Sequence, residues 1–239
     1  MTTKASVAVV DDDSMICEHM LEVEDPNFEV HGAFANVESL LHAEKSFDVV
    51  VLDMWIRPRV NGVTPMRGAA AINAVKRTDA RVVAYTAEER PLVLTGLLAA
   101  GARGIVSKSE PTRALYDAIA EVAAGRKVLP ATVVGLVELA QRHGQLPRLR
   151  PRHIKVLQLR ARGLPWNAIA QELVLSPKTV QEYGSDITGI FVDLLQRVDL
   201  VGLEPDDAHS MAVIAKTLGL AEGDLLDTDL LDPDGRGVH

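Results

Sequence analysis

The sequence predicts an α/β protein in which five short apolar strands alternate with helices, followed by a smaller all-α region. The runs Val7–Val10 and Val49–Leu52 contain only Val, Ala and Leu, and strands this apolar are buried on both faces, as in a parallel sheet covered by helices. After Gly125 the strand pattern stops. We therefore expect a flavodoxin-like (βα)5 domain over residues 1–125 and a second, smaller all-α helix-turn-helix domain.

The hydrophobic pattern justifies each element of the first domain. Apolar runs predict strands near 6–11, 28–34, 48–53, 81–86 and 103–107. Helical periodicity predicts helices near 14–24, 36–45, 64–78, 88–100 and 111–124. Ser14, Asn36 and Thr112 are expected to cap helices, because a side-chain oxygen at a helix start accepts an otherwise unpaired backbone N–H. Pro65 and Pro111 stand near helix starts, where a missing N–H loses no bond.

Beyond Gly125 the pattern predicts only helices. A helical pattern that begins at Arg152 stops at Gly163, and a second helix and a short turn follow. The third helix opens with Pro177, and Ser176 is its expected N-cap, so the pair forms a helix-turn-helix. We expect a linker over residues 126–148, which contains a short helix at 131–142, and a helix-turn-helix domain over 149–220, which ends in a helix near 207–219. An acidic, partly disordered tail over 221–239 is expected to follow.

Composition and charge predict a cytoplasmic protein without membrane spans. The single cysteine, Cys17, cannot form an internal disulfide, and no signal peptide precedes the first strand. No apolar stretch approaches the roughly 18 residues that cross a bilayer. The net charge is −8, yet residues 146–197 hold eight Lys or Arg against four Asp or Glu. This basic segment indicates a nucleic-acid face, although a solvated helix face without a partner has the same composition.

Acidic side chains follow two of the predicted strands. Asp11 and Asp12 come directly after the first strand, and Asp53 ends the third. Because the carboxyl ends of parallel strands open on one edge of the sheet, where open α/β sheets bind ligands, we expect these carboxylates to meet. They would repel each other unless a divalent cation lay among them, and Mg²⁺ prefers such oxygen ligands.

Two further strand ends complete a site for a phosphoryl group. Lys108 would pair with one phosphoryl oxygen, and Thr86 would donate its hydroxyl to another. Asp53 is the better nucleophile candidate because it ends a central strand, and its attack on phosphorus would give an acyl phosphate. Asp13 is expected to cap the following helix or remain in solvent. Each residue alone has an ordinary explanation, as a helix cap, a surface lysine or a strand threonine, so the prediction depends on the whole set.

A resemblance to a known family rests on the motifs Val10-Asp11-Asp12, Leu52-Asp53, Tyr85-Thr86-Ala87, Gly101-Ala102-Arg103-Gly104 and Val106-Ser107-Lys108. With these, residues 1–125 resemble the receiver domain of two-component response regulators. The resemblance implies that Asp53 accepts phosphate from a sensor histidine kinase. It also implies a Mg²⁺ site made of Asp11, Asp12, Asp53 and the backbone carbonyl of Trp55, with Thr86 and Lys108 sensing the phosphoryl group.

Two features depart from the receiver pattern. The proline that commonly stands four residues after the phosphorylated Asp is here Pro58, five residues after Asp53, and an unusually long loop (59–65) follows. The aromatic switch position three residues before the lysine is occupied by Ile105. The sequence therefore lacks, at this position, the aromatic side chain to which the threonine is usually coupled in the family.

The second domain also resembles a known family through Pro151-Arg152, Val156-Leu157, Gly163-Leu164, Ile169-Ala170, Leu173 and Leu175-Ser176-Pro177-Lys178-Thr179-Val180. Residues 149–191 thus resemble the LuxR-type helix-turn-helix of NarL/FixJ response regulators. By the family pattern the third helix enters the major groove. Arg150, Arg152 and Lys155 could add phosphate contacts, although His153 and Lys155 stand where the family often has Glu. The pattern assigns phosphate contacts to Lys178 and Thr179, and base edges to Gln181, Glu182 and Ser185.

The sequence therefore predicts a DNA-binding transcriptional regulator, not an enzyme, controlled by phosphorylation of Asp53. The third helix has few positive charges, so binding to DNA is expected to need a homodimer on adjacent half-sites. One alternative is an atypical receiver that works unphosphorylated, through dimerisation or a small ligand. Others are a phosphatase of the haloacid dehalogenase kind, built on Asp11 to Asp13 with a weak second acidic candidate at Gly223-Asp224, and a protein-binding adaptor that has lost DNA binding.

Overall fold

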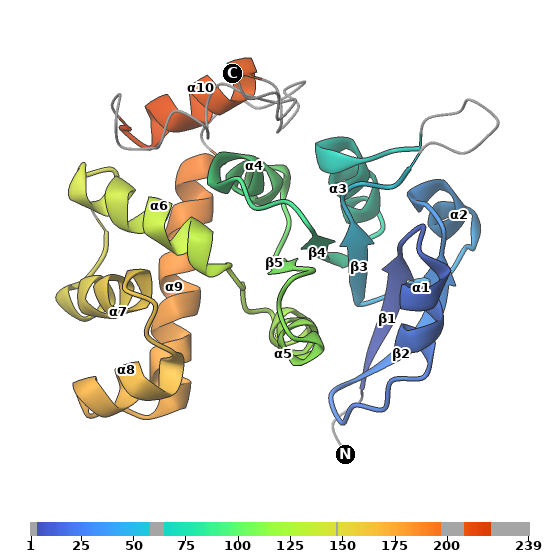
Figure 1. Ribbon diagram of the computed structural model, residues 1–239, viewed down its shortest axis with the longest axis horizontal. Coiled ribbons are helices and arrows are strands. Elements are labelled where there is room, and N and C mark those ends of the chain that lie inside the picture. Colours follow the sequence, from blue (N-terminus) through green and yellow to red (C-terminus); the bar gives the residue numbers. More distant parts are fainter. Residues whose placement is uncertain (1–3, 58–64, 147, 197–207, 221–239) are drawn as a thin grey trace, which may run out of the picture. The chain divides into compact units, whose positions relative to one another are not determined.

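The computed structural model describes residues 4–57, 65–146, 148–196 and 208–220. The chain divides into two compact units, which we call the sheet unit (residues 1–88 and 100–128) and the helical unit (residues 89–99 and 129–239). Figure 1 shows the strands and helices of the first and the helices of the second. The predicted α/β fold followed by an all-helical region is confirmed.

The sheet unit is built on five parallel strands in the order β2-β1-β3-β4-β5, as expected of a flavodoxin-like fold. Each strand lies within one residue of its predicted bounds: β1 (Ala5–Val10), β2 (Phe28–Phe34), β3 (Val49–Asp53), β4 (Arg81–Thr86) and β5 (Gly104–Ser107). Val10 of β1 pairs with Leu52 of β3, and Thr86 of β4 pairs with Ser107 of β5. This register brings the carboxyl ends of four strands to one edge of the sheet.

Helices cover the sheet and bury its apolar strands. Met20 in α1 (Ser14–Leu21) and Ile119 in α5 (Thr112–Ala123) pack in one core cluster with strand residues such as Val9 and Val51. The helices α2 (Val37–His42) and α3 (Gly68–Lys76) contact each other and pack against β2 and β4. Every residue of β3 is buried, which agrees with its unbroken apolar run.

In the sheet unit, the caps predicted at Ser14 and Thr112 are wrong by one residue, while the cap at Asn36 and the alternative expectation that Asp13 caps a helix are confirmed. The N-cap of α1 is Asp13, whose carboxylate accepts a backbone N–H at 2.9 Å, so Ser14 already lies inside the helix. The N-cap of α5 is Pro111, without a side-chain bond, and Thr112 is the first helical residue. Asn36 caps α2 as predicted, accepting a backbone N–H at 2.8 Å. Where polar residues stand side by side, the backbone geometry of the turn decides which of them caps the helix.

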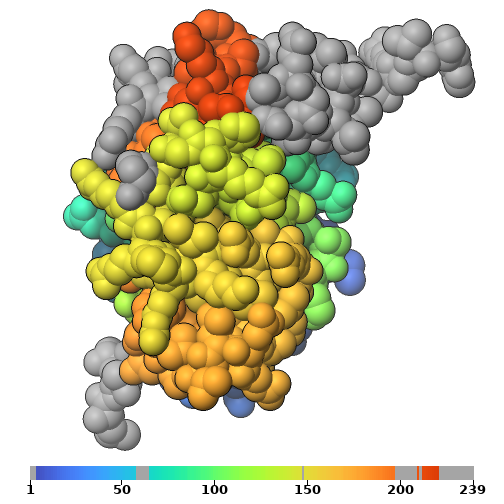
Figure 2. Space-filling view, turned by 90° about the vertical axis from the view of Figure 1, so that its left-hand side faces the viewer, coloured from blue at the N-terminus to red at the C-terminus, as the bar shows by residue number. Residues whose placement is uncertain are grey.

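The described elements of the helical unit are all helices. Figure 2 shows a face of this unit on which α7, in yellow, and α8, in amber, lie in contact. The turn of residues 174–176 joins α8 to α9, so the predicted helix-turn-helix is present. The helices of the unit are α4 (Pro91–Ala100, all but its last residue), α6 (Ala131–Arg142), α7 (Pro151–Ala161), α8 (Trp166–Leu173), α9 (Pro177–Leu195) and α10 (Ala208–Thr217).

The start of α9 follows the predicted pattern. The hydroxyl of Ser176 accepts the backbone N–H of Thr179 at 3.0 Å, and Pro177 occupies the first helical position. Val180 is fully buried, so this turn of the helix presents its neighbours outward. Because Ser176 and Pro177 are favoured at a helix start, the cap fixes where the exposed side chains of α9 begin.

Some predictions concern residues that the structure does not describe. The spacing of the helix-turn-helix pattern predicts about fourteen extra residues before the last helix, roughly 193–206. This insertion, the loop after Pro58 and the acidic tail lie wholly or mostly outside the described residues. The last predicted helix corresponds to α10, in and just after which Ile214 and Leu218 are buried. Within the described ranges, no helix combines the length and apolar character needed to cross a membrane.

Candidate functional site

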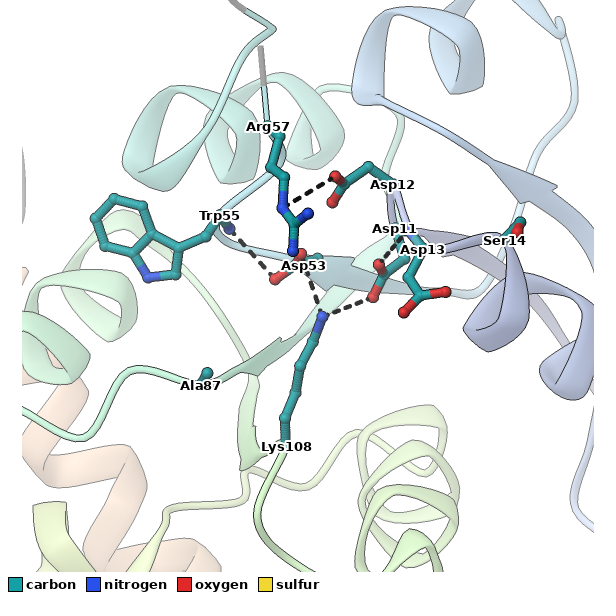
Figure 3. A pocket seen from close by; sticks show the side chains of 9 residues that line it. All are labelled: Asp11, Asp12, Asp13, Ser14, Asp53, Trp55, Arg57, Ala87 and Lys108. Atoms are coloured by element: carbon teal, nitrogen blue, oxygen red, sulfur yellow. Dashed lines mark hydrogen bonds and ion pairs between the residues drawn. The ribbon is translucent and has the colours of Figure 1, made fainter. Parts of the chain in front are cut away.

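An acidic hollow of about 540 Å³ opens at the carboxyl edge of the sheet, and we call it the acidic pocket. Figure 3 shows the nine residues that line it: Asp11, Asp12, Asp13, Ser14, Asp53, Trp55, Arg57, Ala87 and Lys108. They follow β1, β3, β4 and β5, or end them, because the parallel register aligns these strand ends. The predicted convergence of Asp11, Asp12, Asp53 and Lys108 is therefore present in the structure.

Lys108 joins two of the carboxylates. Its Nζ lies 2.9 Å from Oδ2 of Asp11 and 3.2 Å from Oδ2 of Asp53, and both carboxylates are almost fully buried. Burial on its own lowers the pKa of Lys108, but the hydrogen bonds and charges of Asp11 and Asp53 outweigh it, so this pKa is raised. The ammonium group therefore stays charged and holds the two acids in one place.

Asp53 lies at the centre of the pocket. Its Oδ1 accepts the backbone N–H of Trp55 at 3.2 Å, while its Oδ2 faces Lys108. Burial raises the pKa of Asp53 above its usual range, helped by repulsion from Asp11, and the attraction of Lys108 offsets this only in part. A buried carboxylate with raised proton affinity is a better nucleophile than a solvated one once it is ionised.

Three carboxylates in the pocket form a plausible cation site. One oxygen each from Asp11, Asp12 and Asp53 lies within 4.8 Å of the others. Hard carboxylate oxygens in this number are the ligands that Mg²⁺ takes together with water and phosphate oxygens. The donor set of this pocket therefore fits the predicted ion. Asp13 takes no part in this cluster: it caps α1, and its backbone N–H donates to Oδ1 of Asp11 at 2.9 Å.

Thr86 does not line the acidic pocket, although the sequence predicts that its hydroxyl contacts the phosphoryl group. It is fully buried at the end of β4, and its Oγ1 accepts the backbone N–H of Glu88 at 3.1 Å. The next residue, Ala87, lines the pocket, whereas Thr86 does not. The backbone carbonyl of Thr86 accepts the N–H of Lys108 at 2.7 Å, so the two predicted sensing residues are linked through the main chain.

Arg57 belongs to the pocket but was not singled out from the sequence. Its Nε lies 3.9 Å from Oδ2 of Asp12, and it follows β3 on the same loop as Trp55. The sequence feature that could have indicated Arg57 is its position: a cationic residue four residues after Asp53, near the edge of the sheet where the acids meet. Trp55 is 38% exposed, and the guanidinium of Arg67 lies 5.9 Å from its ring centroid.

The five residues that the family pattern assigns to DNA contacts lie on α9. Lys178, Gln181 and Glu182 are exposed, and Thr179 and Ser185 are partly exposed. The helix has a single basic residue, Lys178, against Glu182, Asp186 and Asp193. Positive charge is instead found around the start of α7, where Arg150, Arg152 and Lys155 are exposed, as predicted. These residues form an exposed set rather than a pocket.

Two packing features of the helix-turn-helix were missed in the sequence. His153 is buried against α9, with its ring 5.2 Å from that of Tyr183. Trp166 packs onto Gly184, where an added Cβ would lie 2.7 Å from the indole ring. The guanidinium of Arg160 lies 4.8 Å from the same ring. Both features hold α9 against its neighbours, and a histidine or a glycine in a helical pattern gives little sign of such packing.

Comparison with known proteins adds independent findings. The family model of the response regulator receiver domain matches residues 7–120. The probable transcriptional regulatory protein SgaR of Hyphomicrobium methylovorum is 30% identical over 186 residues, which cover 76% of this chain and 83% of that protein. A putative transcriptional regulator of Pseudomonas aeruginosa is 32% identical over 189 residues, covering 77% and 89%. A solved RcsB response regulator of Salmonella typhimurium is 23% identical with a TM-score of 0.49, covering 82% and 98%.

Proposed function

The chain belongs to the response regulators, here transcriptional regulators with a receiver domain, and from this premise we propose that Asp53 accepts a phosphoryl group and thereby controls DNA binding by the helix-turn-helix. The observation that carries the proposal is the bridge of Lys108 between Asp11 and Asp53 inside an acidic pocket. Membership in a family of transcriptional regulators decides against the phosphatase alternative. Its second acidic candidate, Gly223-Asp224, lies outside the described residues.

The proposed reaction is a phosphoryl transfer to Asp53. A carboxylate oxygen of Asp53 attacks phosphorus, and the bond from phosphorus to the donor atom breaks. The electron pair of that bond leaves with the donor, either the imidazole of a sensor kinase histidine, which takes up a proton, or a small carboxylate. Lys108, already placed at Asp53, then pairs with a phosphoryl oxygen. Thr86 accepts a bond from Glu88, so its own hydroxyl hydrogen is the one it would donate.

Asp11, Asp12, Asp53 and the backbone carbonyl of Trp55 are proposed to hold Mg²⁺. When bound, the ion offsets negative charge on the phosphoryl oxygens. The closeness of the three carboxylates supports this assignment. Asp11 and Asp53 are buried and paired with Lys108, so their carboxylates are preorganised for a ligand, while Asp12 is more exposed.

The output side is proposed to bind DNA through α9. Lys178 and Thr179 would hold phosphates, while Gln181, Glu182 and Ser185 would face base edges in the major groove. The exposure of Lys178, Gln181 and Glu182 supports these roles. Because α9 itself carries more acid than base, we propose that two copies bind adjacent half-sites together. The proposed division is a receiver over 1–125, a linker over 126–148, the DNA-binding domain over 149–220 and an acidic tail over 221–239.

The central test is phosphorylation of the Asp53→Asn variant. Wild-type protein with Mg²⁺ and a radiolabelled small acyl phosphate should gain one labelled acyl phosphate, and Asp53→Asn should gain none, because an amide is not a nucleophile of this kind. Asp13→Asn is the matched control: the same chemical change, in the same pocket, at a residue outside the carboxylate cluster. Equal labelling of Asp53→Asn and wild type would contradict the assignment of Asp53.

The same experiment tests the alternative that the receiver works unphosphorylated. Ile105 favours this alternative, since a buried aliphatic side chain stands where the family usually has an aromatic switch. No labelling of folded wild-type protein, with Mg²⁺ and donor in excess, would support it. Labelling that is lost only in Asp53→Asn would decide against it.

The DNA-binding proposal is tested by separating phosphate from base contacts. Lys178→Gln should weaken binding to all sequences and reduce the dependence of affinity on salt by about one ion. Gln181→Ala should leave the salt dependence unchanged and cost about 1–3 kcal/mol on the preferred site only. Binding that is unaffected by either variant, or a lack of salt-dependent retention on DNA, would support the adaptor alternative instead.

A further inference from the structure

We propose that Arg57 is a built-in counter-ion of the acidic pocket, which neutralises Asp12 until a divalent cation binds and then contacts the phosphoryl group on Asp53. The second half of this proposal rests on the proposed function, and the first half does not. The receiver pattern commonly has a proline at this position, four residues after the phosphorylated Asp, so the resemblance assigns no role to a charged side chain there. Figure 3 shows the side chain of Arg57 turned toward the acidic cluster from the loop after β3.

The contacts of the pocket divide its carboxylates into two groups. Asp11 and Asp53 both contact Lys108, at 2.9 Å and 3.2 Å. Asp12 has no contact with Lys108 within the described part of the chain, and its Oδ2 lies 3.9 Å from Nε of Arg57. Arg57 therefore gives Asp12 the positive neighbour that Lys108 gives the other two. The side chain of Arg57 is 90% exposed, so few neighbouring atoms restrict it and its guanidinium group can change rotamer.

The charges of the pocket explain why Arg57 must move. The carboxylate cluster of Asp11, Asp12 and Asp53 and the two cations, Lys108 and Arg57, sum to a single formal negative charge; Asp13 lines the pocket but lies outside this cluster and is not counted. A divalent cation on the same acids would reverse this sign if Arg57 stayed at Asp12. Arg57 and the metal therefore compete for one carboxylate, and binding of the metal displaces the guanidinium.

Phosphorylation gives the displaced guanidinium a new partner. A phosphoryl group on Asp53 carries about two negative charges, whereas the carboxylate it modifies carried one. With Mg²⁺ and Lys108 in place, one negative charge again remains, and Arg57 neutralises it. The planar guanidinium also matches phosphoryl oxygens in geometry, because it can donate two parallel hydrogen bonds. Arg57 thus serves as a positioning residue that favours the phosphorylated state.

Arg67 provides a matched control on the same side of the pocket. It stacks over the ring of Trp55 at 5.9 Å, does not line the pocket, and carries the same charge as Arg57. Arg67→Gln therefore changes the charge of the surface without removing a partner of Asp12. Arg57→Lys keeps the charge at position 57 and loses the bidentate geometry.

The first measurement is Mg²⁺ affinity of the full chain without any phosphodonor. The two tryptophans are Trp55 and Trp166, so a Trp166→Phe background leaves Trp55, at the pocket, as the fluorescent reporter. Arg57→Gln should bind Mg²⁺ about threefold more tightly at low salt, the effect expected of an exposed ion pair. Arg57→Lys and Arg67→Gln should stay near wild type. Equal affinity in Arg57→Gln and Arg67→Gln would overturn the first half of the proposal.

The second measurement is binding of beryllofluoride, a mimic of the acyl phosphate, in saturating Mg²⁺. Arg57→Gln should bind it about threefold to tenfold more weakly, Arg57→Lys should be intermediate, and Arg67→Gln should be unchanged. Unchanged affinity in Arg57→Gln would overturn the second half. If wild-type protein binds no beryllofluoride, both the proposed function and the proposed contact of Arg57 with the phosphoryl group are wrong. The Mg²⁺ titration would still decide whether Arg57 neutralises Asp12.

Discussion

The acidic pocket and the exposed side of α9 differ in how the chain builds them. The pocket collects side chains from the ends of four strands that lie far apart in sequence, and two of its acids, Asp11 and Asp53, are buried and paired with Lys108. The exposed side of α9 presents side chains from a few consecutive turns, such as Gln181 and Glu182. The topology therefore places the buried acids and the lysine of the first site, whereas the second set of side chains is exposed and forms no pocket.

Charge sharpens the difference between the two regions. In the pocket, opposite charges are paired within the protein at hydrogen-bond distance. On α9, Lys178 is the one basic residue among three acidic ones, and the exposed basic residues Arg150, Arg152 and Lys155 lie around the start of α7. Removing Lys108 from the pocket should therefore destabilise the fold, whereas removing an exposed charge such as Lys178 from α9 should leave the stability nearly unchanged.

The largest effect on stability is expected for Lys108→Met. This change leaves two buried carboxylates without their shared cation, and we expect a loss of about 2 kcal/mol in the free energy of unfolding without Mg²⁺. Urea unfolding, followed by the signal of the sheet unit, measures it. Added Mg²⁺ should restore part of the loss, because the ion then supplies the missing positive charge.

Lys155→Met is the control for this prediction, because Lys155 is an exposed lysine of α7. Its effect on the free energy of unfolding should stay within about 0.5 kcal/mol. Equal losses for Lys108→Met and Lys155→Met would break the comparison between a buried, paired site and an exposed one.

A smaller effect is expected from the titration of His153 in the helical unit. Burial lowers the pKa of His153; Asp186, 3.6 Å from its Nε2, acts in the opposite direction, and Arg150 lowers the pKa further. Among the described residues neither ring nitrogen has a hydrogen-bond partner. Because the lowered pKa favours the neutral ring in the folded state, stability is fully present above the unfolded pKa of about 6.5 and falls as pH drops below it.

The measurement is the free energy of unfolding of the helix-turn-helix between about pH 8 and pH 5. His153→Leu fills a similar volume and does not titrate, so its stability should be flatter over this range. Asp186→Asn should steepen the loss, since it removes the charge that favours the protonated ring. A steeper curve for His153→Leu than for wild type would contradict the sign of this prediction.

The pocket was largely predictable from sequence because its residues obey a topological rule. Asp11, Asp53 and Lys108 stand directly at the ends of buried strands, and parallel strands must end at one edge. Thr86 follows the same rule in position but not in orientation, because a side chain at a strand end can point into the core or out of it. Arg57 was missed because it lies on a loop, where no periodicity relates sequence to position.

The helix-turn-helix was predictable in outline and less so in its packing. Ser176 and Val180 follow local rules of capping and periodicity, and both were placed correctly. The apolar Ile154 belongs to the helical pattern of α7, yet it is only partly buried, while its polar neighbour His153 is almost fully buried. Helical periodicity has a tolerance of about one residue, so the identity of a buried position depends on which side chain the neighbouring helix accepts.

The smallest effect concerns the turn of the helix-turn-helix, where Val174 is 90% exposed. Its backbone is left-handed, with φ 54° and ψ 50°, a conformation that a β-branched residue adopts at a cost. Val174→Asn should raise the free energy of unfolding by about 0.5–1 kcal/mol, since Asn tolerates this region. Val174→Thr keeps the branched shape and should gain nothing. If Val174→Asn stabilises the fold but weakens retention on DNA, the exposed valine contacts the partner, and the strain at this turn is part of the binding surface.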